Sequence, residues 1–341
     1  MFTHLHTHTE YSLLDGLSRI NPMVQKCVDL GMDSIAITDH GAMYGVLDFY
    51  SEALEKGIKP IIGCEVYVAP GDRKSKDSTD RTPFHLTLLA KDNAGYKNLI
   101  QLVSKAHLEG FYYRPRVDKQ LLEEYRNGIV VLSGCLNGEI AKNIQADRMQ
   151  AAKSVASWFK EVFRDDFYLE LQRHPGLTEQ DSVNTSLLEL NKDLGIPIVA
   201  TNDFHYVHKE DAPLQDILIC IHTNTTVNDK ARLKMHGDSF YLKSAEEMTA
   251  LFEDIPQAIS NTQRISEMCD VRINFDQIYL PDYKSLEKIN KSIENVISYE
   301  NILSNQKILF RYGSSQWCIQ KTAFRIKVWR LNRNWPVNHP I

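Results

Sequence analysis

The sequence lacks several features that mark whole classes of protein. Its six cysteines stand singly, at positions 27, 64, 135, 220, 269 and 318, and none belongs to a CxxC pair. Neither a zinc ribbon nor a disulfide scaffold is therefore indicated, and we expect a reducing cytoplasm as the compartment. No run of about 18 apolar residues occurs, which argues against a transmembrane helix. The N-terminus has no basic start and no apolar stretch, so we expect no signal peptide.

The composition is that of a globular protein, but the charge is unevenly distributed. Of the 341 residues, 43% are hydrophobic and 24% are charged, which is typical of a folded chain. From Lys307 to the end there are seven Lys or Arg and no Asp or Glu, whereas the preceding 306 residues carry a net charge of −12. Three of the four tryptophans also lie in this basic tail, at positions 317, 329 and 335.

Short β-rich runs alternate with amphipathic helical patterns through the first two thirds of the chain. The expected strands are Thr3–His8, Ser34–Thr38, Lys59–Val68, Phe84–Ala90, Ile129–Ser133, Phe167–Gln172 and Pro197–Thr201. The first expected helix begins at Asn21-Pro22 and ends at Gly31. Four further helices are expected over about Met43–Lys56, Ala94–His107, Ala146–Val162 and Glu179–Leu194. This alternation predicts an α/β fold with a parallel βα array, and a barrel of that kind ordinarily has about 250 residues.

The remainder of the chain predicts a different organisation. Residues 207 to 280 read as mostly helical, with one short strand around Phe240–Leu242, and beyond about Pro281 we find no clean helical or strand period. We therefore expect one domain over residues 1–282, with a barrel over about 1–225 and a helical bridge over about 226–282. An irregular, basic, Trp-rich tail would follow over 283–341.

Histidines and carboxylates gather where the expected strands end. In the THLHTH run, alternate side chains share one face of a strand, so His6 and His8 project together, about 7 Å apart. His4 lies on the same face, and periodicity alone does not decide which pair binds a metal. Two further clusters close other strands: Asp39-His40 follows SIAIT, and Asp203 and His205 follow PIVAT.

Four single residues complete the set, namely Asp15, Glu65, His85 and Cys135. Taken alone, each has an ordinary explanation: a core or surface histidine, a salt-bridged carboxylate, or a small buried thiol. Taken together, imidazoles, carboxylates and a thiol recur at strand ends, where βα barrels place their active sites. The pattern predicts a metal site.

Several segments resemble the PHP (polymerase and histidinol phosphatase) domain. They are HLHTHTEYSLLDG, AITDHGAMYGVLDFY, KPIIGCEVYVAP, HLTLLAKDNAGYKNLIQLVS, VVLSGCLNGEI and PIVATNDFHY. The runs GFYYRPRVDKQLL and GDSFYLKSAEEM look more like the PHP domain of bacterial replicative polymerases, the C-family alpha subunits of DNA polymerase III, than like a free phosphatase. The resemblance covers about residues 1 to 282 and implies a distorted seven-stranded βα barrel.

The resemblance also implies a trinuclear metal site. The family's nine ligand positions fall on His6, His8, Asp15, His40, Glu65, His85, Cys135, Asp203 and His205, and all nine carry metal-binding residue types. His6, His8, Glu65 and Asp203 would hold the first ion. Glu65 would bridge to a second, bound with His85 and Cys135, and Asp15, His40 and His205 would hold the third.

This ligand set suggests phosphoester hydrolysis. Imidazole and thiolate favour Zn²⁺, and the carboxylates also admit Mn²⁺ or Mg²⁺. A group of cations lowers the pKa of a bound water, so no side-chain nucleophile is needed. The resemblance implies removal of nucleotides from a DNA primer 3′ end, in the 3′-to-5′ direction. Asp39 is assigned to orient a ligand imidazole, with a helix cap as the alternative.

A loop of aromatic and basic residues is a candidate DNA contact. Tyr112, Tyr113, Arg114 and Arg116 lie together in FYYRPR, where they would stack a base and hold a phosphate. The alternative is an ordinary packed loop with solvated arginines. Because the body is acidic, we do not expect tight DNA binding by this domain alone.

The features of a polymerase active site are missing. A polymerase palm holds two magnesium ions with paired carboxylates, yet none of the 24 aspartates is separated from another by one residue. We therefore expect no DNA synthesis by this chain alone. The tail departs from the family after Leu280-Pro281. We interpret it as the product of a frameshift or truncated gene, with a basic nucleic-acid arm as the alternative, and resequencing the locus distinguishes them.

Three functions remain open at this point. The first is a metal-dependent exonuclease or phosphoesterase. The second is a structural metal-binding module that docks the separate proofreading exonuclease subunit. The third is a stand-alone phosphatase of the histidinol phosphatase kind. In the full-length family protein the sliding clamp and clamp loader would be further partners, and no membrane association is expected.

Overall fold

The fold is described from a computed structural model, which describes all residues except 14, 277–307, 313–314, 323–324 and 332–341. The chain divides into two compact units, Met1–Ile273 and Asn274–Ile341. The domain boundary expected at residue 282 lies outside the described residues.

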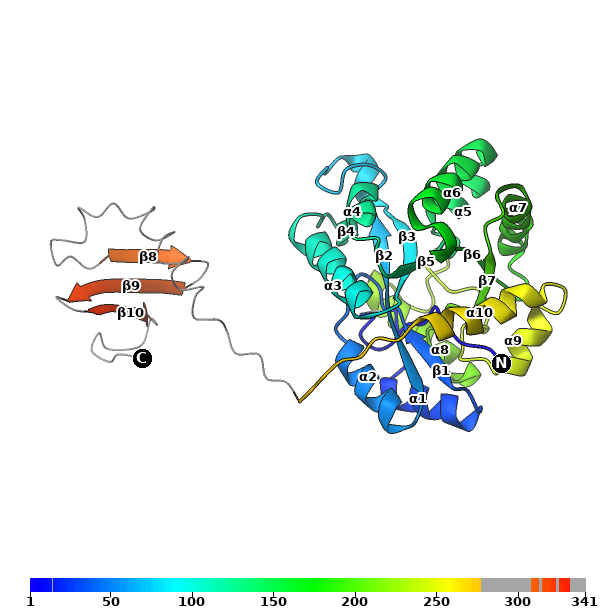
Figure 1. Ribbon diagram of the computed structural model, residues 1–341, viewed down its shortest axis with the longest axis horizontal. Helices are drawn as coiled ribbons and strands as arrows, with labels where there is room; N and C mark the ends of the chain where they lie inside the picture. The colour runs from blue at the N-terminus through cyan, green and yellow to red at the C-terminus, as the bar shows by residue number, and fades with distance from the viewer. Residues whose placement is uncertain (14, 277–307, 313–314, 323–324, 332–341) are drawn as a thin grey trace. The chain divides into compact units, whose positions relative to one another are not determined.

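The first unit is built on one curled sheet with helices around it (Figure 1). The strand order is β1 (Ser34–Ile37), β2 (Lys59–Val68), β3 (Phe84–Ala90), β5 (Ile129–Leu132), β6 (Phe167–Gln172) and β7 (Ile198–Thr201), and β4 (Arg116–Val117) pairs with β2. The expected α/β class and the seven-stranded sheet are confirmed.

One strand departs from the parallel arrangement that the sequence predicts. β3 runs antiparallel to both of its neighbours, β2 and β5, whereas the other strand pairs of this sheet are parallel. A parallel return needs a long crossover, usually a helix. Between β2 and β3 there is only the short 3₁₀ helix η1 (Ser78–Arg81), which suits an antiparallel return.

The N-terminal segment joins the two edges of the sheet without forming a regular strand. Where a strand was expected over Thr3–His8, isolated bridges link His4 to Ile35 and Thr7 to Phe204. The carbonyl of His4 accepts from Ala36 N at 2.8 Å, and His8 N donates to the Phe204 carbonyl at 3.0 Å. The segment thus lies between β1 and the end of β7. The short strand β4, which the sequence analysis missed, makes up the count of seven.

The helices follow the predicted pattern closely. The five expected ones are α1 (Ile20–Asp29), α2 (Val46–Glu55), α3 (Asn93–Leu108), α6 (Met149–Phe163) and α7 (Thr178–Leu194). The remaining ones are α4 (Lys119–Glu124), α5 (Glu139–Gln145), α8 (Ala212–Thr223), α9 (Ala245–Leu251) and α10 (Pro256–Met268). The strand expected at Phe240–Leu242 is a single bridge between Tyr206 and Tyr241.

The core explains why polar residues collect at one end of the sheet. A large apolar cluster fills the space between the strands and the helices, and a smaller one includes Ile61, Val130 and Val199, each from the first half of its strand. Ile265 of α10 belongs to the smaller cluster. Apolar packing thus occupies the end where the parallel strands begin, and the carboxyl ends remain for polar side chains.

The second unit contains a small antiparallel sheet. β8 (Ile308–Tyr312), β9 (Ser315–Thr322) and β10 (Arg325–Leu331) pair in the order β10-β9-β8. We expected no regular period here, and the structure differs at these three strands. Their sequences are rich in β-branched and aromatic residues, which favour strands.

Two further features are the absence of a membrane-spanning helix among the described residues and the state of the cysteines. No helix in the described part of the chain has the length and apolar character to cross a bilayer. The cysteines at positions 27, 64, 135, 220 and 269 are free thiols.

Candidate metal centre

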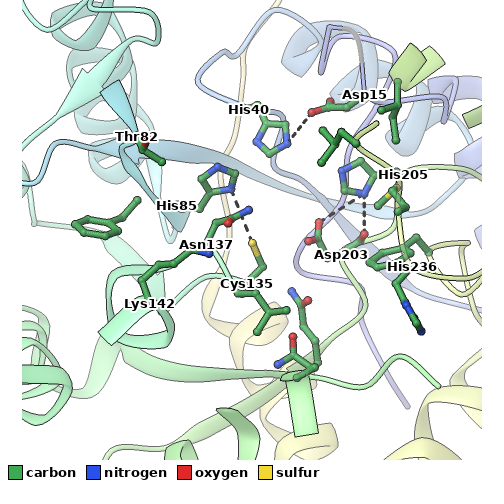
Figure 2. Close-up of a pocket in the computed structure, with 18 of the residues that line it drawn as sticks. Asp15, His40, Thr82, His85, Cys135, Asn137, Lys142, Asp203, His205 and His236 are labelled. Carbon is green, nitrogen blue, oxygen red and sulfur yellow. Dashed lines mark hydrogen bonds and ion pairs between the residues drawn. The ribbon is translucent and has the colours of Figure 1, made fainter. Parts of the chain in front are cut away.

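The structure brings all nine predicted ligands together where the parallel strands end. Six of them, Asp15, His40, His85, Cys135, Asp203 and His205, line one pocket and are visible in Figure 2. The other three, His6, His8 and Glu65, are buried and contact members of this set. The pocket has a volume of about 810 Å³.

Glu65, near the end of β2, is the central carboxylate of this cluster. Its Oε1 lies 2.9 Å from His85 Nδ1 and 3.4 Å from His6 Nε2. Its Oε2 lies 2.6 Å from His40 Nδ1 and 3.5 Å from His8 Nε2. Since Glu65 is 1% exposed, it touches four imidazoles in a setting without bulk water.

His6, His8 and Asp203 form the most buried group of possible ligands. Asp203 Oδ1 lies 3.4 Å from His6 Nε2 and 3.0 Å from His8 Nε2. Each of the three residues offers a ligand atom within 4.8 Å of the others. Asp203 has a left-handed backbone, with φ of 49°, which is uncommon for a residue other than glycine. The preceding Asn202 anchors this turn by donating to the carbonyls of Ser239 and Tyr241.

The remaining predicted ligands lie on two sides of Glu65. On one side His40 Nε2 is 3.0 Å from Asp15 Oδ2, and the ring of His205 stacks on that of His8. On the other side Cys135 Sγ lies 3.8 Å from His85 Nδ1. Two further groups also bring their ligand atoms within 4.8 Å of one another, namely His8–His40–His205 and His40–Glu65–His85.

The hydrogen bonding of the cluster is incomplete in a way that fits bound cations. His6 Nε2, His8 Nε2, His40 Nδ1, Asp15 Oδ1, Glu65 Oε2 and Asp203 Oδ1 are buried and make no hydrogen bond of good geometry, although most of them lie 2.6–3.5 Å from one another as imidazole–carboxylate pairs. Buried polar atoms are ordinarily paired, and leaving one unpaired costs about 1–3 kcal/mol. These six atoms belong to the predicted ligand set, and the same condition is met by buried atoms outside it, such as His4 Nδ1 and the Tyr168 hydroxyl. Nitrogen, oxygen and thiol donors of this kind suit Zn²⁺ or Mn²⁺, so the residues present fit the metals that the sequence implies.

The electrostatics show strong coupling among these groups. Burial lowers the pKa of His6, but the carboxylates of Asp203, Glu170 and Glu65 outweigh it and hold that pKa well above its usual value. Burial raises the pKa of Glu65, but the imidazoles of His85, His40 and His6 bring it well below its usual value. Burial, together with the imidazoles of His40 and His205, lowers the pKa of His8 to about 3.

These shifts have a simple physical meaning. Without metal, protonated imidazoles balance the buried carboxylates. Since a metal-binding imidazole must be neutral, metals bound here would displace protons, and their affinity would rise with pH.

Glu170 of β6 is a functional candidate that the sequence analysis missed. It is 1% exposed, and its Oε1 accepts from His6 Nδ1 at 2.6 Å and from Thr201 Oγ1 at 2.5 Å. The His6 contact turns Nε2 toward Glu65 and Asp203, as a carboxylate behind a ligating histidine does in metal sites. The available signal was a lone carboxylate inside the otherwise buried strand FYLELQ.

Asp39 does not have the contacts that were expected of it. Its carboxylate accepts from Thr9 N at 2.6 Å and from Thr9 Oγ1 at 2.8 Å, and neither partner is an imidazole. It is not the cap of the following helix either, because the N-cap of α2 is Gly45. Asp39 instead fastens the end of the segment that carries His6 and His8. The imidazole of His8 is oriented by Ser12, whose Oγ lies 3.0 Å from His8 Nδ1.

The aromatic and basic loop divides into a packed part and an exposed part. Arg116 is fully buried and donates to the carbonyls of Gly110, Arg73 and Ser75, so its prediction as a DNA contact was wrong. Its neighbour Tyr112 lies against the Arg116 guanidinium, 5.2 Å from it. In contrast, Arg114 lines the pocket and Tyr113 is 62% exposed.

Known proteins support a family assignment. The sequence profile of the family described as "PHP domain" matches residues 4–174, half of the chain. DNA polymerase III subunit alpha of Borreliella burgdorferi is 47% identical over 326 residues, covering 95% of this chain and 28% of the relative. The corresponding protein of Helicobacter pylori strain 26695 is 44% identical over 283 residues, covering 80% and 23%. The chain thus spans about a quarter of the length of these curated relatives.

The sequence relatives match most of the chain closely, whereas the solved structures resemble it only distantly. Because the Borreliella alignment covers 95% of the chain, it extends past residue 283 into the segment expected to leave the family. Among solved structures, a putative metal-dependent phosphoesterase from Bifidobacterium adolescentis has a TM-score of 0.37 at 12% identity, covering 73% of this chain and 95% of its own. A likeness this distant carries no argument about function. The profile match and the polymerase relatives do, and on them the chain belongs to the PHP domain family.

Proposed function

We propose that this chain is a metal-dependent phosphoesterase that removes nucleotides from a DNA 3′ end. The observation that carries the proposal is the convergence of imidazole and carboxylate ligand atoms at this centre, where three groups of side chains each bring their atoms within 4.8 Å of one another. The similarity to DNA polymerase III alpha subunits supports DNA as the substrate.

The nine converging side chains would hold three divalent ions, Zn²⁺ or Mn²⁺, with Mg²⁺ as a further candidate. We assign His6, His8, Glu65 and Asp203 to the first ion. Glu65, His85 and Cys135 are assigned to the second, and Asp15, His40 and His205 to the third. The grouping of His6, His8 and Asp203 within 4.8 Å supports the first assignment. When bound, such ions supply an activated water and neutralise phosphate charge.

Neighbouring residues hold the predicted ligands in position. Glu170 and Ser12 fix the rings of His6 and His8, and Asp39 fixes the backbone at Thr9. The pocket opens to solvent beside Arg114, whose guanidinium lies 5.5 Å from the ring of Tyr67. Tyr67 in turn lies 5.2 Å from the ring of His85, and we assign Arg114, which lines the same pocket as the predicted ligands, to hold a phosphate.

The test is a gel assay on a 5′-labelled primer–template with Mn²⁺ or Zn²⁺, with and without dNTPs, beside His8→Ala. Stepwise shortening that needs metal and is lost in His8→Ala supports the proposal. No shortening, with metal shown to be bound, would favour a structural module that docks the proofreading subunit. Extension of the primer would refute our expectation that this chain alone makes no DNA.

The wider context is also proposed from similarity. As part of a longer polymerase, the chain would work in the cytoplasm with the proofreading exonuclease subunit, the sliding clamp and the clamp loader. A stand-alone histidinol-phosphatase-like enzyme is the alternative, and hydrolysis of a small phosphate monoester in preference to DNA would favour it. The interpretation of residues 283–341 as a frameshift product stays a prediction.

A further inference from the structure

The pocket that ends at the metal centre is lined by an excess of positive charge. Its cationic residues are Arg81, Arg114, Lys142, Arg148 and Lys234. Among the lining residues whose side chains the structure describes, the only carboxylates are Asp15 and Asp203, which belong to the ligand set. This contrasts with the net charge of −5 for the whole chain. The positive charge is therefore concentrated where a substrate would enter.

The five cations, which we call the basic rim, come from four separate segments of the chain. Arg81 ends η1 and Arg114 lies in the loop before β4. Lys142 is on α5, and Arg148 is the residue before α6. Lys234 lies between α8 and α9. Figure 2 shows Lys142 and His236, two residues from Lys234, on different sides of the ligand cluster.

The cations of the basic rim form no ion pairs within the described part of the fold. Within the part of the chain that the structure describes, none of the five forms an ion pair with a carboxylate, and Lys142 donates to the neutral side chain of Gln145. Arginines elsewhere behave differently: Arg173 pairs with Asp254, and Arg232 pairs with Asp216. The basic rim thus keeps its charge available for an anion.

Aromatic rings accompany two of these cations. The Arg81 guanidinium lies 5.4 Å from the ring of Tyr113, which is 62% exposed. The Arg114 guanidinium lies 5.5 Å from the ring of Tyr67. Proteins that bind single strands without sequence preference combine cations along the backbone with rings on which bases stack. A small phosphate ester would engage only one or two cations, whereas five cations from four segments suit several successive phosphates.

We infer that the basic rim is a phosphate-binding track for a single-stranded nucleic acid whose end enters the metal centre. This inference rests on the proposed function, because it supplies the strand that the metal centre would cleave. The track would recognise phosphates rather than base edges, so binding would show little sequence preference.

The number of cations sets the salt dependence of binding. For single strands, the logarithm of affinity falls with the logarithm of salt by about 0.7 for each phosphate neutralised. Five contacts give a slope of about −3.5, so affinity falls roughly 130-fold between 50 and 200 mM salt. Lys142→Gln with Arg148→Gln removes two contacts, which reduces the slope to about −2.1 and the loss to roughly 20-fold.

The experiment measures anisotropy of a 5′-fluorescein dT12 oligonucleotide in EDTA, where no hydrolysis occurs. Parent protein, the double variant Lys142→Gln/Arg148→Gln and a control, Lys97→Gln/Arg126→Gln, are compared across salt concentrations. Lys97 and Arg126 are exposed and do not line the pocket, so the control changes the net charge equally. A ribose oligonucleotide, U12, distinguishes DNA from RNA. Inorganic phosphate as competitor reports a site for small anions.

The expected result is a shallower slope and weaker binding for the rim variant alone. Equal slopes for the two double variants would overturn the inference, and so would complete competition by millimolar phosphate. Hydrolysis of bis(p-nitrophenyl) phosphate with Mn²⁺ separates the two proposals. If the parent neither hydrolyses this ester nor shortens DNA, the proposed function fails, while the anisotropy result still tests the basic rim. If the rim variant retains ester hydrolysis but shortens DNA more slowly, both are supported.

Discussion

Replacing Glu170 with glutamine tests whether a buried carboxylate behind His6 builds the metal centre. Glu170 Oε1 accepts from His6, Thr201 and Gln172, while Oε2 accepts from Gly134 N at 3.1 Å. In Glu170→Gln the amide oxygen can keep the first three contacts. The amide nitrogen then faces the N–H of Gly134, a donor against a donor.

Two magnitudes follow from this geometry. Losing a buried hydrogen bond to a charged acceptor costs about 1.5–3 kcal/mol, so the free energy of unfolding of metal-free Glu170→Gln should fall by about that amount. Weakening the partner of a ligating histidine lowers metal affinity by about 10–100-fold. Urea unfolding in EDTA measures the first effect, and calorimetric titration with Zn²⁺ or Mn²⁺ measures the second.

The control for this experiment is Glu161→Gln, an exposed residue of α6. A surface change of this kind should alter stability by no more than about 0.5 kcal/mol. If Glu170→Gln unfolds like the control and binds metal with parental affinity, then the contact between Glu170 and His6 does not support the centre, and the reasoning fails.

Three other predictions follow from buried groups. Arg116→Met should lower the free energy of unfolding in urea by about 3 kcal/mol because buried carbonyls lose a charged donor. The control Arg114→Met should keep the free energy of unfolding within about 0.5 kcal/mol of the parent protein. Equal losses in the two variants would contradict the conclusion that Arg116 is buried and Arg114 is not. Burial and Lys243 lower the pKa of His174 from 6.5 to about 3, so this ring stays neutral in the fold and its contribution to stability declines as pH falls below 6.5. Between pH 6.5 and 4.5 in EDTA, the free energy of unfolding should therefore depend less steeply on pH in His174→Gln than in the parent, by up to about 1.4 kcal/mol per pH unit. Parallel curves for the two proteins would exclude this contribution of His174. Zn²⁺ or Mn²⁺ at a free concentration of 100 times Kd should raise the free energy of unfolding by about 2.7 kcal/mol, and an unchanged thermal midpoint would argue against the site.

The sequence predicted the fold class and the side chains of the metal centre because both depend on local pattern. β2, β3 and β6 have the predicted bounds, since apolar runs between turn residues mark buried strands. The nine residues predicted as ligands were singled out because they are metal-binding residue types at the ends of such runs, and their role as ligands stays a prediction. The resemblance to the PHP domain supplied their grouping, which no periodicity contains.

The sequence could not rank the histidines of the THLHTH run, and tertiary packing does so. His4 lies 4.8 Å from the ring of Phe2 and 5.0 Å from that of Phe204, and its Nε2 bonds the carbonyl of Lys243. His6 and His8 meet Asp203 instead. All three are equivalent by alternation, so only the neighbours that the fold brings from distant segments separate them.

The same limit applies to the charged residues that were misjudged or missed. Arg114 and Arg116 are two positions apart, yet one lines the pocket and the other bonds three carbonyls in the interior. Glu170 looks like an ordinary strand residue until β6 places it behind His6. Residue type and spacing thus determined the fold class and which candidate metal-binding side chains are present. Which charges are buried, paired or left facing the pocket was decided by contacts between segments far apart in the chain, because burial and pairing are properties of the packed fold.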